Sequence, residues 1–429
     1  MSLSTQPYKG ARDFYPEDKR IQKYMFGKLR QVVESFGYQE YDAPIIEPID
    51  LYLSKSSDEI ISEQTYSFAD RGGRNVTLRP EMTPTVSRMV AGRRQELAYP
   101  LRWYSIPDLW RYERPQAGRL RQHYQLNIDI FGVAGIAADH EIILVADSIM
   151  QSFGAQRDMY TIRLNSRQLI NAILADYLDG SDEQLLAVIR LIDHKAKMPH
   201  EEFKVALGEL APGKENELVD IISVESFEEL PEKYRQHPSV AELISLKQLL
   251  AANGITNVVD DLSLMRGFDY YTDIVFEVFD TAPENNRSMF GGGRYDGLVA
   301  QFGVEPVPTV GFGMGDVTLQ NFLETHDLLP KLKPETELAV ILIGEVYDKA
   351  QPVLNELRQR GINTAVDSSG RKLDNQIKGA VKSGVRYAMF LGEQELESNQ
   401  FKLRNLKKSE ETQLSLDQIA STLADARNE

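Results

Sequence analysis

Four short segments of the chain concentrate the residue types that bind charged substrates. They are LRPEMT (78–83), RYERPQAGRLRQHYQLNID (111–129), RGFDYYT (266–272) and FGGGRYDG (290–297). None of them matches a Walker loop, a dinucleotide-binding glycine fingerprint, a nucleophile elbow or an HExxH metal motif. The sequence therefore excludes the commonest nucleotide-binding folds.

The second segment holds a cluster of four arginines. Arg111, Arg114, Arg119 and Arg121 surround the turn Pro-Gln-Ala-Gly. Because planar guanidinium groups bind phosphates and carboxylates through paired hydrogen bonds, the cluster predicts an anionic substrate. A surface hairpin with internal salt bridges is an alternative that accounts for the same residues.

The same segment continues into a run with the alternation of a β-strand. Within residues 123–130 the polar positions are His123, Gln125, Asn127 and Asp129. A period of two places these four side chains on one face of the strand. That face is either the solvent-exposed side of a sheet or the wall of a binding site, and the neighbouring motifs favour the binding site.

The elements that must position these segments follow from hydrophobic periodicity. We expect an amphipathic helix over residues 21–36, closed by Gly37, and then short strands as far as about residue 132. Residues 165–255 have Leu, Ile and Ala at helical spacing and predict a helical insertion. Strand character returns at 269–279.

The C-terminal part alternates between strands and helices after a linker, PKLKPETE, that follows Leu329. The expected elements are strands at 338–343, 364–366 and 387–391, and helices at 349–360 and 373–383. Strands separated by helices predict a small sheet that is at least partly parallel.

Two domains are therefore expected. Residues 1–330 would form an α+β domain built on an antiparallel sheet with the helical insertion at about 165–255, and residues 331–429 a small α/β domain.

The composition narrows the class of protein. The 429 residues include no cysteine and six histidines, which excludes disulfides and thiolate zinc sites. No stretch resembles a membrane span or a secretory signal, so we expect a cytoplasmic protein that does not enter a membrane.

The charge is unevenly distributed. The net charge of −16 argues against indiscriminate binding to a phosphate backbone. Residues 331–429 carry fifteen basic and fifteen acidic side chains, so the negative excess lies in residues 1–330. The stretch 371–388 has five basic side chains against one acid, which predicts either a solvated helix face or a nucleic-acid contact.

Together the segments resemble the motifs of class II aminoacyl-tRNA synthetases, and of histidyl-tRNA synthetases in particular. Arg111, Glu113 and the loop 118–121 are similar to the second class motif, and GYQEYDAPIIEP (37–48) to the first, dimer-forming one. RGFDYYT and GGGRYDG look like the two motifs peculiar to histidyl-tRNA synthetases. The resemblance extends from Gly10 to a C-terminal domain that looks like an anticodon-binding domain.

The resemblance implies a homodimeric enzyme that ligates histidine to tRNA(His) through a histidyl-adenylate, with ATP and Mg²⁺ and no metal bound by the protein itself. The implied catalytic residues, Arg111 and Arg266, would flank the α-phosphate and the reacting carboxylate. A structural turn in which Arg266 pairs with Asp269 is the alternative.

The resemblance also implies a histidine pocket. Its residues would be Glu81, Thr83, Arg111, Gln125, Asp129, Arg266, Tyr270 and Tyr271. Asp129 would accept a hydrogen bond from an imidazole N–H, so an amino acid without ring nitrogens would leave this carboxylate unpaired. A structural ion pair between Asp129 and an arginine is the alternative.

Further residues are implied for ATP and tRNA. ATP would contact Arg111, Glu113, Arg119, Gly313 and Gly315, and tRNA would contact Gln116, Arg121, Arg371, Lys372 and Lys378. The sequence departs from the family pattern at Thr318, where the third class motif usually has an arginine for the γ-phosphate. Either another cation such as Arg119 carries more of that charge or activation has been lost, and the surviving substrate residues favour the first.

Three other functions fit parts of the pattern. A non-catalytic synthetase paralogue, the regulatory subunit of ATP phosphoribosyltransferase, would explain Thr318 but generally lacks the C-terminal domain. A class II synthetase for another amino acid would not need RGFDYYT with Gln125 and Asp129. A tRNA-binding protein without activity would not need Arg266.

Overall fold

The computed structural model describes residues 3–53, 64–116, 118–178, 181–195, 198–265, 270–285 and 288–427. The chain divides into two compact units. Unit 1 consists of Met1–Phe14 and Gln22–Leu329, and unit 2 of Tyr15–Ile21 and Pro330–Glu429.

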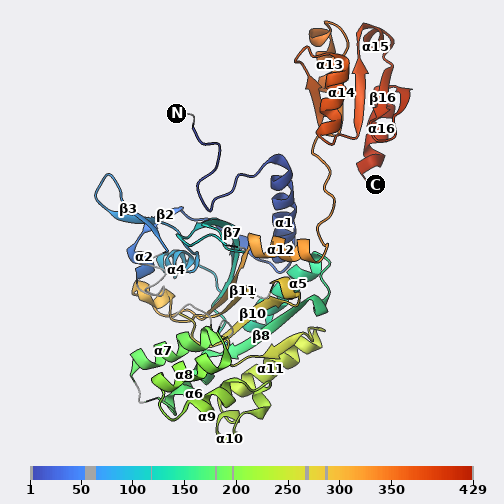
Figure 1. Ribbon diagram of the computed structural model, residues 1–429. Coiled ribbons are helices and arrows are strands. Elements are labelled where there is room, and N and C mark those ends of the chain that lie inside the picture. The colour runs from blue at the N-terminus through green and yellow to red at the C-terminus, as the bar shows by residue number, and fades with distance from the viewer. Residues whose placement is uncertain are drawn as a thin grey trace. The chain divides into compact units, whose positions relative to one another are not determined.

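Within the described residues, unit 1 is built on a nine-stranded sheet (Figure 1). The strand order is β1-β5-β7-β12-β11-β10-β8-β9, and β6 pairs with β7. Most pairs are antiparallel, while β1 with β5 and β8 with β9 are parallel. Their bounds are β1 (Gln39–Glu40), β5 (Leu101–Ser105), β6 (Asp108–Trp110), β7 (Gln122–Phe131), β8 (Tyr160–Ser166), β9 (Val258–Asp260), β10 (Ile274–Asp280), β11 (Ser288–Arg294) and β12 (Thr309–Gly315).

A small antiparallel sheet, with strand order β2-β4-β3, lies beside the helices at Asp50–Leu53 and Thr83–Gly92 (Figure 1). Its strands are β2 (Ile46–Pro48), β3 (Tyr66–Ala69) and β4 (Asn75–Leu78). Among the described residues, the α-helices of unit 1 outside the insertion are α1 (Pro16–Ser35), of which the residues up to Ile21 belong to unit 2, α2 (Asp50–Leu53), α4 (Thr83–Gly92), α5 (Ala137–Ser152) and α12 (Asp316–Thr325).

Helix α1 confirms the helix expected before Gly37. Met25, Leu29 and Val33 recur on one side of it and are buried. Gly37, just after the helix, has a φ of +83°, a left-handed conformation that glycine adopts without steric cost.

A group of helices lies between β8 and β9 in the sequence and gathers at one side of the unit (Figure 1). The first of them, α6, is capped by the Ser166 hydroxyl, which accepts a hydrogen bond from the Leu169 amide at 3.3 Å. Their bounds are α6 (Arg167–Ala175), α7 (Asp182–Asp193), α8 (His200–Leu210), α9 (Glu215–Ile222), α10 (Glu232–Arg235) and α11 (Pro238–Ala252).

Unit 2 has a sheet of strand order β14-β13-β15-β16-β17. The pairs β13–β14 and β13–β15 are parallel, which confirms the partly parallel sheet, while β15–β16 and β16–β17 are antiparallel. Leu354, Met389 and Phe401 are among the fully buried side chains of its core. The elements are β13 (Leu338–Leu342), α13 (Tyr347–Gln359), β14 (Thr364–Asp367), α14 (Leu373–Lys382), β15 (Tyr387–Leu391), α15 (Glu393–Ser398), β16 (Phe401–Asn405), β17 (Glu410–Leu414) and α16 (Leu416–Arg427).

The expected fold class is confirmed: a large, mainly antiparallel sheet with helices is followed by a separate, smaller α/β unit. The strand expected from residue 269 begins at Ile274 instead. Among the helices that the structure describes, none is long and apolar enough to cross a membrane.

Strands β11 and β12 approach each other so closely that one position between them admits only glycine. A Cβ atom at Gly292 would lie 1.9 Å from the Gly311 carbonyl oxygen and 2.6 Å from the Phe312 Cα atom. Both are backbone atoms in the centre of the sheet, so neither can move without disturbing the hydrogen-bonded pairs around it.

We therefore expect Gly292→Ala to destabilise unit 1 by about 1–3 kcal/mol or more, as overpacking of a rigid core does. Gly297→Ala is the matched control, because no atom lies within 4 Å of a Cβ built there. Thermal unfolding followed by circular dichroism measures both. Equal midpoints for the two variants would show that the close approach is not a constraint.

Candidate active site

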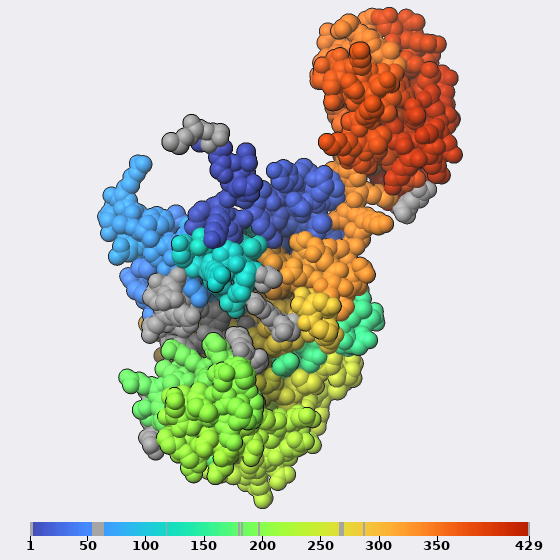
Figure 2. All heavy atoms as spheres, viewed as in Figure 1, coloured from blue at the N-terminus to red at the C-terminus, as the bar shows by residue number. Residues whose placement is uncertain are grey.

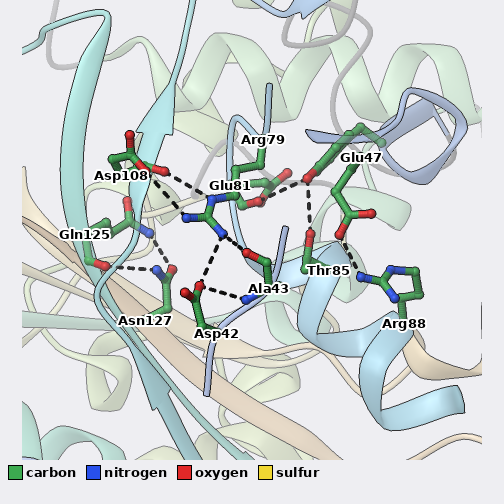
Figure 3. Close-up of polar contacts among 11 residues, drawn as sticks. Asp42, Ala43, Glu47, Arg79, Glu81, Thr85, Arg88, Asp108, Gln125 and Asn127 are labelled. Carbon is green, nitrogen blue, oxygen red and sulfur yellow. Dashed lines mark hydrogen bonds and ion pairs between the residues drawn. The ribbon is translucent and has the colours of Figure 1, made fainter. Parts of the chain in front are cut away.

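The polar face of β7 is buried at Asn127 and Asp129 and half-buried at His123 and Gln125, so it is not the solvent-exposed side of a sheet. Asn127 and Asp129 are both 5% exposed. The Gln125 side-chain amide donates to Oδ1 of Asn127 at 2.7 Å, and Nδ2 of Asn127 donates back to the Gln125 carbonyl at 3.1 Å (Figure 3). The strand therefore presents an ordered row of polar groups inside the unit.

Asp129 is a buried carboxyl group whose partner is a tyrosine. The Tyr295 hydroxyl donates a hydrogen bond to Oδ1 of Asp129. Burial raises the pKa of Asp129 from 3.8 to about 7, and the hydrogen bond from Tyr295 opposes this rise. No arginine among the described residues pairs with Asp129, so the alternative of a structural ion pair finds no support there.

Sequence reasoning missed Tyr295. It lies in FGGGRYDG, a segment in which the sequence alone indicated no role for it. A buried tyrosine needs a hydrogen-bond partner for its hydroxyl. The polar face predicted for residues 123–130 was the signal in the sequence that could have indicated this partner.

Glycines of β12 make room for the polar side chains of β7. Gly311 lies opposite Asp129, and a Cβ atom there would be 2.1 Å from Oδ1 of Asp129. A Cβ atom at Gly313, which the resemblance assigned to ATP, would lie 2.3 Å from Nε2 of Gln125. Gly315 precedes α12 as its N-cap residue.

Two further segments meet beside this strand. The Tyr270 hydroxyl donates to Oε2 of Glu81 at 3.2 Å and lies 3.4 Å from Oγ1 of Thr83. The Tyr270 ring lies 5.0 Å from that of Tyr271 and 5.7 Å from that of Tyr295, centroid to centroid. Tyr295 in turn holds Asp129, so these side chains form one connected group.

Arg79 joins the chain segment that carries Glu81 to two neighbouring segments. The sequence alone indicated no role for this residue. Its buried guanidinium donates to the Ala43 carbonyl at 2.6 Å and to the Asp108 carbonyl at 3.2 Å. The carboxylates of Asp42 and Asp108 each lie 3.5 Å from it. Figure 3 shows Arg79 bridging these chain segments beside Glu81.

The arginine cluster forms a hairpin with internal contacts. Arg111 donates from Nε to the Pro80 carbonyl at 2.9 Å, next to Glu81. Glu113 lies 4.0 Å from Arg111 and 3.4 Å from Arg119, while Arg114 is exposed. The salt bridges of the hairpin alternative are therefore present, and Arg111 also reaches the segment that carries Glu81 and Thr83.

Arg266 lies outside the described residues, as does Asp269. The convergence of Arg111 and Arg266, and the alternative turn that contains Asp269, both stay predictions.

Thr318 has a local structural role. Its hydroxyl donates to the Met289 carbonyl at 2.8 Å and lies 3.2 Å from the Gly315 carbonyl.

A nearby cation that the sequence reading missed is Arg12, which pairs with the buried Asp316 at 2.7 Å. Burial, together with the charges of Arg111 and Arg12, lowers the pKa of His123 to about 3.

The basic stretch of unit 2 lies on α14 and just before it. Lys372 and Lys378 are exposed, and Arg371 forms an ion pair with Asp367. This arrangement is compatible with a solvated helix face and with a nucleic-acid contact.

No group of three or more His, Asp or Glu side chains in the described part of the chain could hold a metal ion.

Comparison with known proteins places this geometry in a family. The family model described as "Histidyl-tRNA synthetase" matches residues 10–317, and the model described as "Anticodon binding domain" matches residues 337–426. The curated Histidine--tRNA ligase of Leptospira biflexa is 40% identical over 411 residues, which cover 94% of each chain.

Solved structures share the fold. Histidyl-tRNA synthetase from Nostoc sp. PCC 7120 has a TM-score of 0.82 at 22% identity and covers 99% of this chain and 100% of its own. A Bacillus halodurans structure titled as an ATP phosphoribosyltransferase regulatory subunit/histidyl-tRNA synthetase has a TM-score of 0.74 at 22% identity, over 91% of this chain and 100% of its own. The two family models and the near full-length relative decide the assignment, and the chain belongs to the histidyl-tRNA synthetase family.

Proposed function

We propose that this chain activates histidine with ATP and transfers it to tRNA(His), as a class II histidine–tRNA ligase. The observation that supports this most strongly is the connected group of Glu81, Tyr270, Tyr295 and Asp129 in a chain that matches histidine–tRNA ligases over nearly its whole length. We further propose residues 1–330 as the catalytic domain and residues 331–429 as the anticodon-binding domain.

Two reactions follow from this proposal. A histidine carboxylate oxygen attacks the α-phosphorus of ATP, the bond to the bridging oxygen of the β-phosphate breaks, and pyrophosphate leaves. A ribose hydroxyl at the tRNA 3′ end then attacks the carbonyl carbon, and AMP leaves. Neither step needs a protein nucleophile, so the rate depends on alignment and on stabilisation of charge.

Positive charge at the reacting phosphate would come from Arg111 and Arg266. Arg111 is held beside Glu81 by its bond to the Pro80 carbonyl, which favours a place next to the amino acid. Glu113, Arg119, Gly313 and Gly315 are proposed to contact ATP, which enters as its Mg²⁺ complex. With threonine at position 318, Arg119 and the newly found Arg12 are the candidate cations for the distal phosphates.

The histidine side chain would be recognised by Asp129. Burial raises the pKa of this carboxyl to about 7, although the hydrogen bond from the Tyr295 hydroxyl opposes the rise. An imidazole N–H that donates a hydrogen bond to Asp129 would stabilise its ionised form. The site would therefore bind histidine more tightly than an amino acid that lacks this donor. Glu81, Thr83 and Gln125 would receive the ammonium group, with Tyr270 and Tyr271 beside the ring.

For the tRNA, we propose Gln116 and Arg121 at the acceptor end and Arg371, Lys372 and Lys378 at the anticodon. We also propose that the chain works as a homodimer in the cytoplasm, on the resemblance of residues 37–48 to the dimer-forming class motif. The alternative of a regulatory paralogue is not better supported.

Histidine-dependent exchange between ATP and pyrophosphate tests the proposal. We expect exchange with histidine and none above background with the other nineteen amino acids, because the site is built to pair ring nitrogens. Absence of exchange with histidine would refute the enzyme. Exchange with a different amino acid would refute the specificity.

Arg266→Ala should lower kcat for adenylation by about 10²- to 10³-fold, with a smaller effect on the KM for histidine, because its contact strengthens in the transition state. Arg235→Ala, an exposed arginine of α10, is the matched control. Steady-state exchange kinetics measure both variants. A kcat equal to that of the control would remove Arg266 from the mechanism.

Asp129→Asn should weaken histidine binding and stabilise the fold at neutral pH. A folded-state pKa of about 7, raised from 3.8, means that stability from this group is complete below about pH 4 and is lost as the pH rises through 7. The variant cannot ionise, so its unfolding temperature relative to wild type should rise from pH 4 to pH 8.

Asp70→Asn is a control of opposite sign. The pKa of Asp70 is lowered by hydrogen bonds from the Arg74 backbone and side chain, so this carboxylate stabilises the fold above its usual pKa. The control should therefore lose stability relative to wild type as the pH rises. Parallel pH profiles for the two variants would contradict the assignment of a raised pKa to Asp129.

A further inference from the structure

An aromatic surface surrounds Arg121 at the edge of the arginine hairpin. Tyr8 and Tyr112 are 52% and 50% exposed, and Tyr66 of β3 lies between them, with ring centroids 6.2 Å and 5.2 Å away. The Arg121 guanidinium carbon lies 4.2 Å from the Tyr112 ring centroid and 5.5 Å from that of Tyr8. We call Tyr8, Tyr66, Tyr112 and Arg121 the tyrosine surface.

The tyrosine surface is held in place by three separate segments. The Arg121 amide donates to the Gly10 carbonyl at 2.8 Å, and the Tyr112 amide donates to the Gln64 carbonyl at 2.8 Å. Figure 2 shows the N-terminal segment, in dark blue, beside the turquoise hairpin on one face of the molecule.

Side-chain contacts fix the rings further. The Arg121 guanidinium donates to the Tyr8 hydroxyl at 3.0 Å, and the Tyr66 hydroxyl donates to that of Tyr8 at 3.4 Å. Gly10, with φ of +88°, lets the chain pass against the Arg121 side chain, since a Cβ there would lie 2.7 Å from Cγ. Half-exposed rings are therefore held rigidly rather than packed into a core.

The charge around the tyrosine surface favours a nucleic-acid partner. Arg114 and Arg119 are exposed on the same hairpin, in a protein whose net charge is −16. Rigid aromatic faces stack on unpaired bases, and neighbouring arginines attract the phosphates that link them. A protein partner would also use tyrosines, but the arginine cluster matches a polyanion better.

We propose that the tyrosine surface binds the unpaired nucleotides at the acceptor end of tRNA by stacking, chiefly through Tyr112 and Tyr8. This rests on the proposed function, which supplies the tRNA, and it assigns a stacking role to tyrosines of the N-terminal segment, of β3 and of the hairpin. Arg121 then has two roles. It holds the tyrosine rings in place, and it puts a positive charge next to the bound nucleotides.

A double-mutant cycle between protein and tRNA tests the proposal by direct binding. The full chain, as wild type and as Tyr112→Ala, is titrated with fluorescent tRNA(His), either intact or lacking its unpaired 3′ nucleotides. We expect Tyr112→Ala to weaken binding of intact tRNA about 5- to 150-fold, the range for loss of stacking on one base, and to leave binding of truncated tRNA within about 2-fold.

Three variants complete the test. Tyr112→Phe keeps the ring and should bind intact tRNA nearly as well as wild type, Tyr8→Ala should behave like Tyr112→Ala, and the exposed Tyr15→Ala serves as control. Equal losses with intact and truncated tRNA, or none, would overturn the proposal. If Tyr112→Ala sedimented as a smaller assembly than the wild type, the proposal would also be overturned, because the tyrosine surface would then be a contact between two copies of the chain. Failure of the proposed function appears separately, as absence of histidine-dependent exchange by the wild type.

Discussion

The buried carboxyl group of Asp129 is the constraint on which the rest of unit 1 depends. A carboxyl inside a sheet is costly unless it is paired, and here the Tyr295 hydroxyl is its hydrogen-bond partner. The side chain of Asp129 has space because the residue opposite it on β12 is Gly311. Strand β12 also approaches β11 so closely that position 292 of β11 must be a glycine. The glycine-rich strands and the polar strand are therefore one arrangement, in which the glycines make room for a buried carboxyl group that we propose recognises the substrate.

The groups around Asp129 divide into those that would touch substrates and those that hold them. Glu81 is approached by Tyr270 from one side, while Arg79 ties the same segment to Ala43 and Asp108 through buried bonds. The arginine hairpin joins this frame where Arg111 meets Pro80. In the proposed function, recognition of the amino acid and of the phosphates would therefore be coupled through residues 79–83.

The sequence predicted elements wherever periodicity was strong. Helix α1, strand β7 and the alternating first half of unit 2 lie where expected, because their apolar residues recur with the period of the element. Strands β16 and β17 were missed, since the sequence of β17 is almost wholly polar and exposed. The polar face of β7 was predicted, but its partner Tyr295 was not, nor were the contacts of Arg79 and Arg12, because contacts between distant segments leave no periodic signal. The catalytic role of Arg266 stays a prediction from resemblance, and its pairing with Asp269 stays the untested alternative.

A crystal structure with histidine bound tests the central claim most directly. The account predicts an imidazole nitrogen about 2.6–3.2 Å from a carboxylate oxygen of Asp129, with the amino group toward Glu81 and Thr83. Histidine bound with its ring away from Asp129, or Asp129 still contacting only Tyr295 in the occupied site, would contradict it.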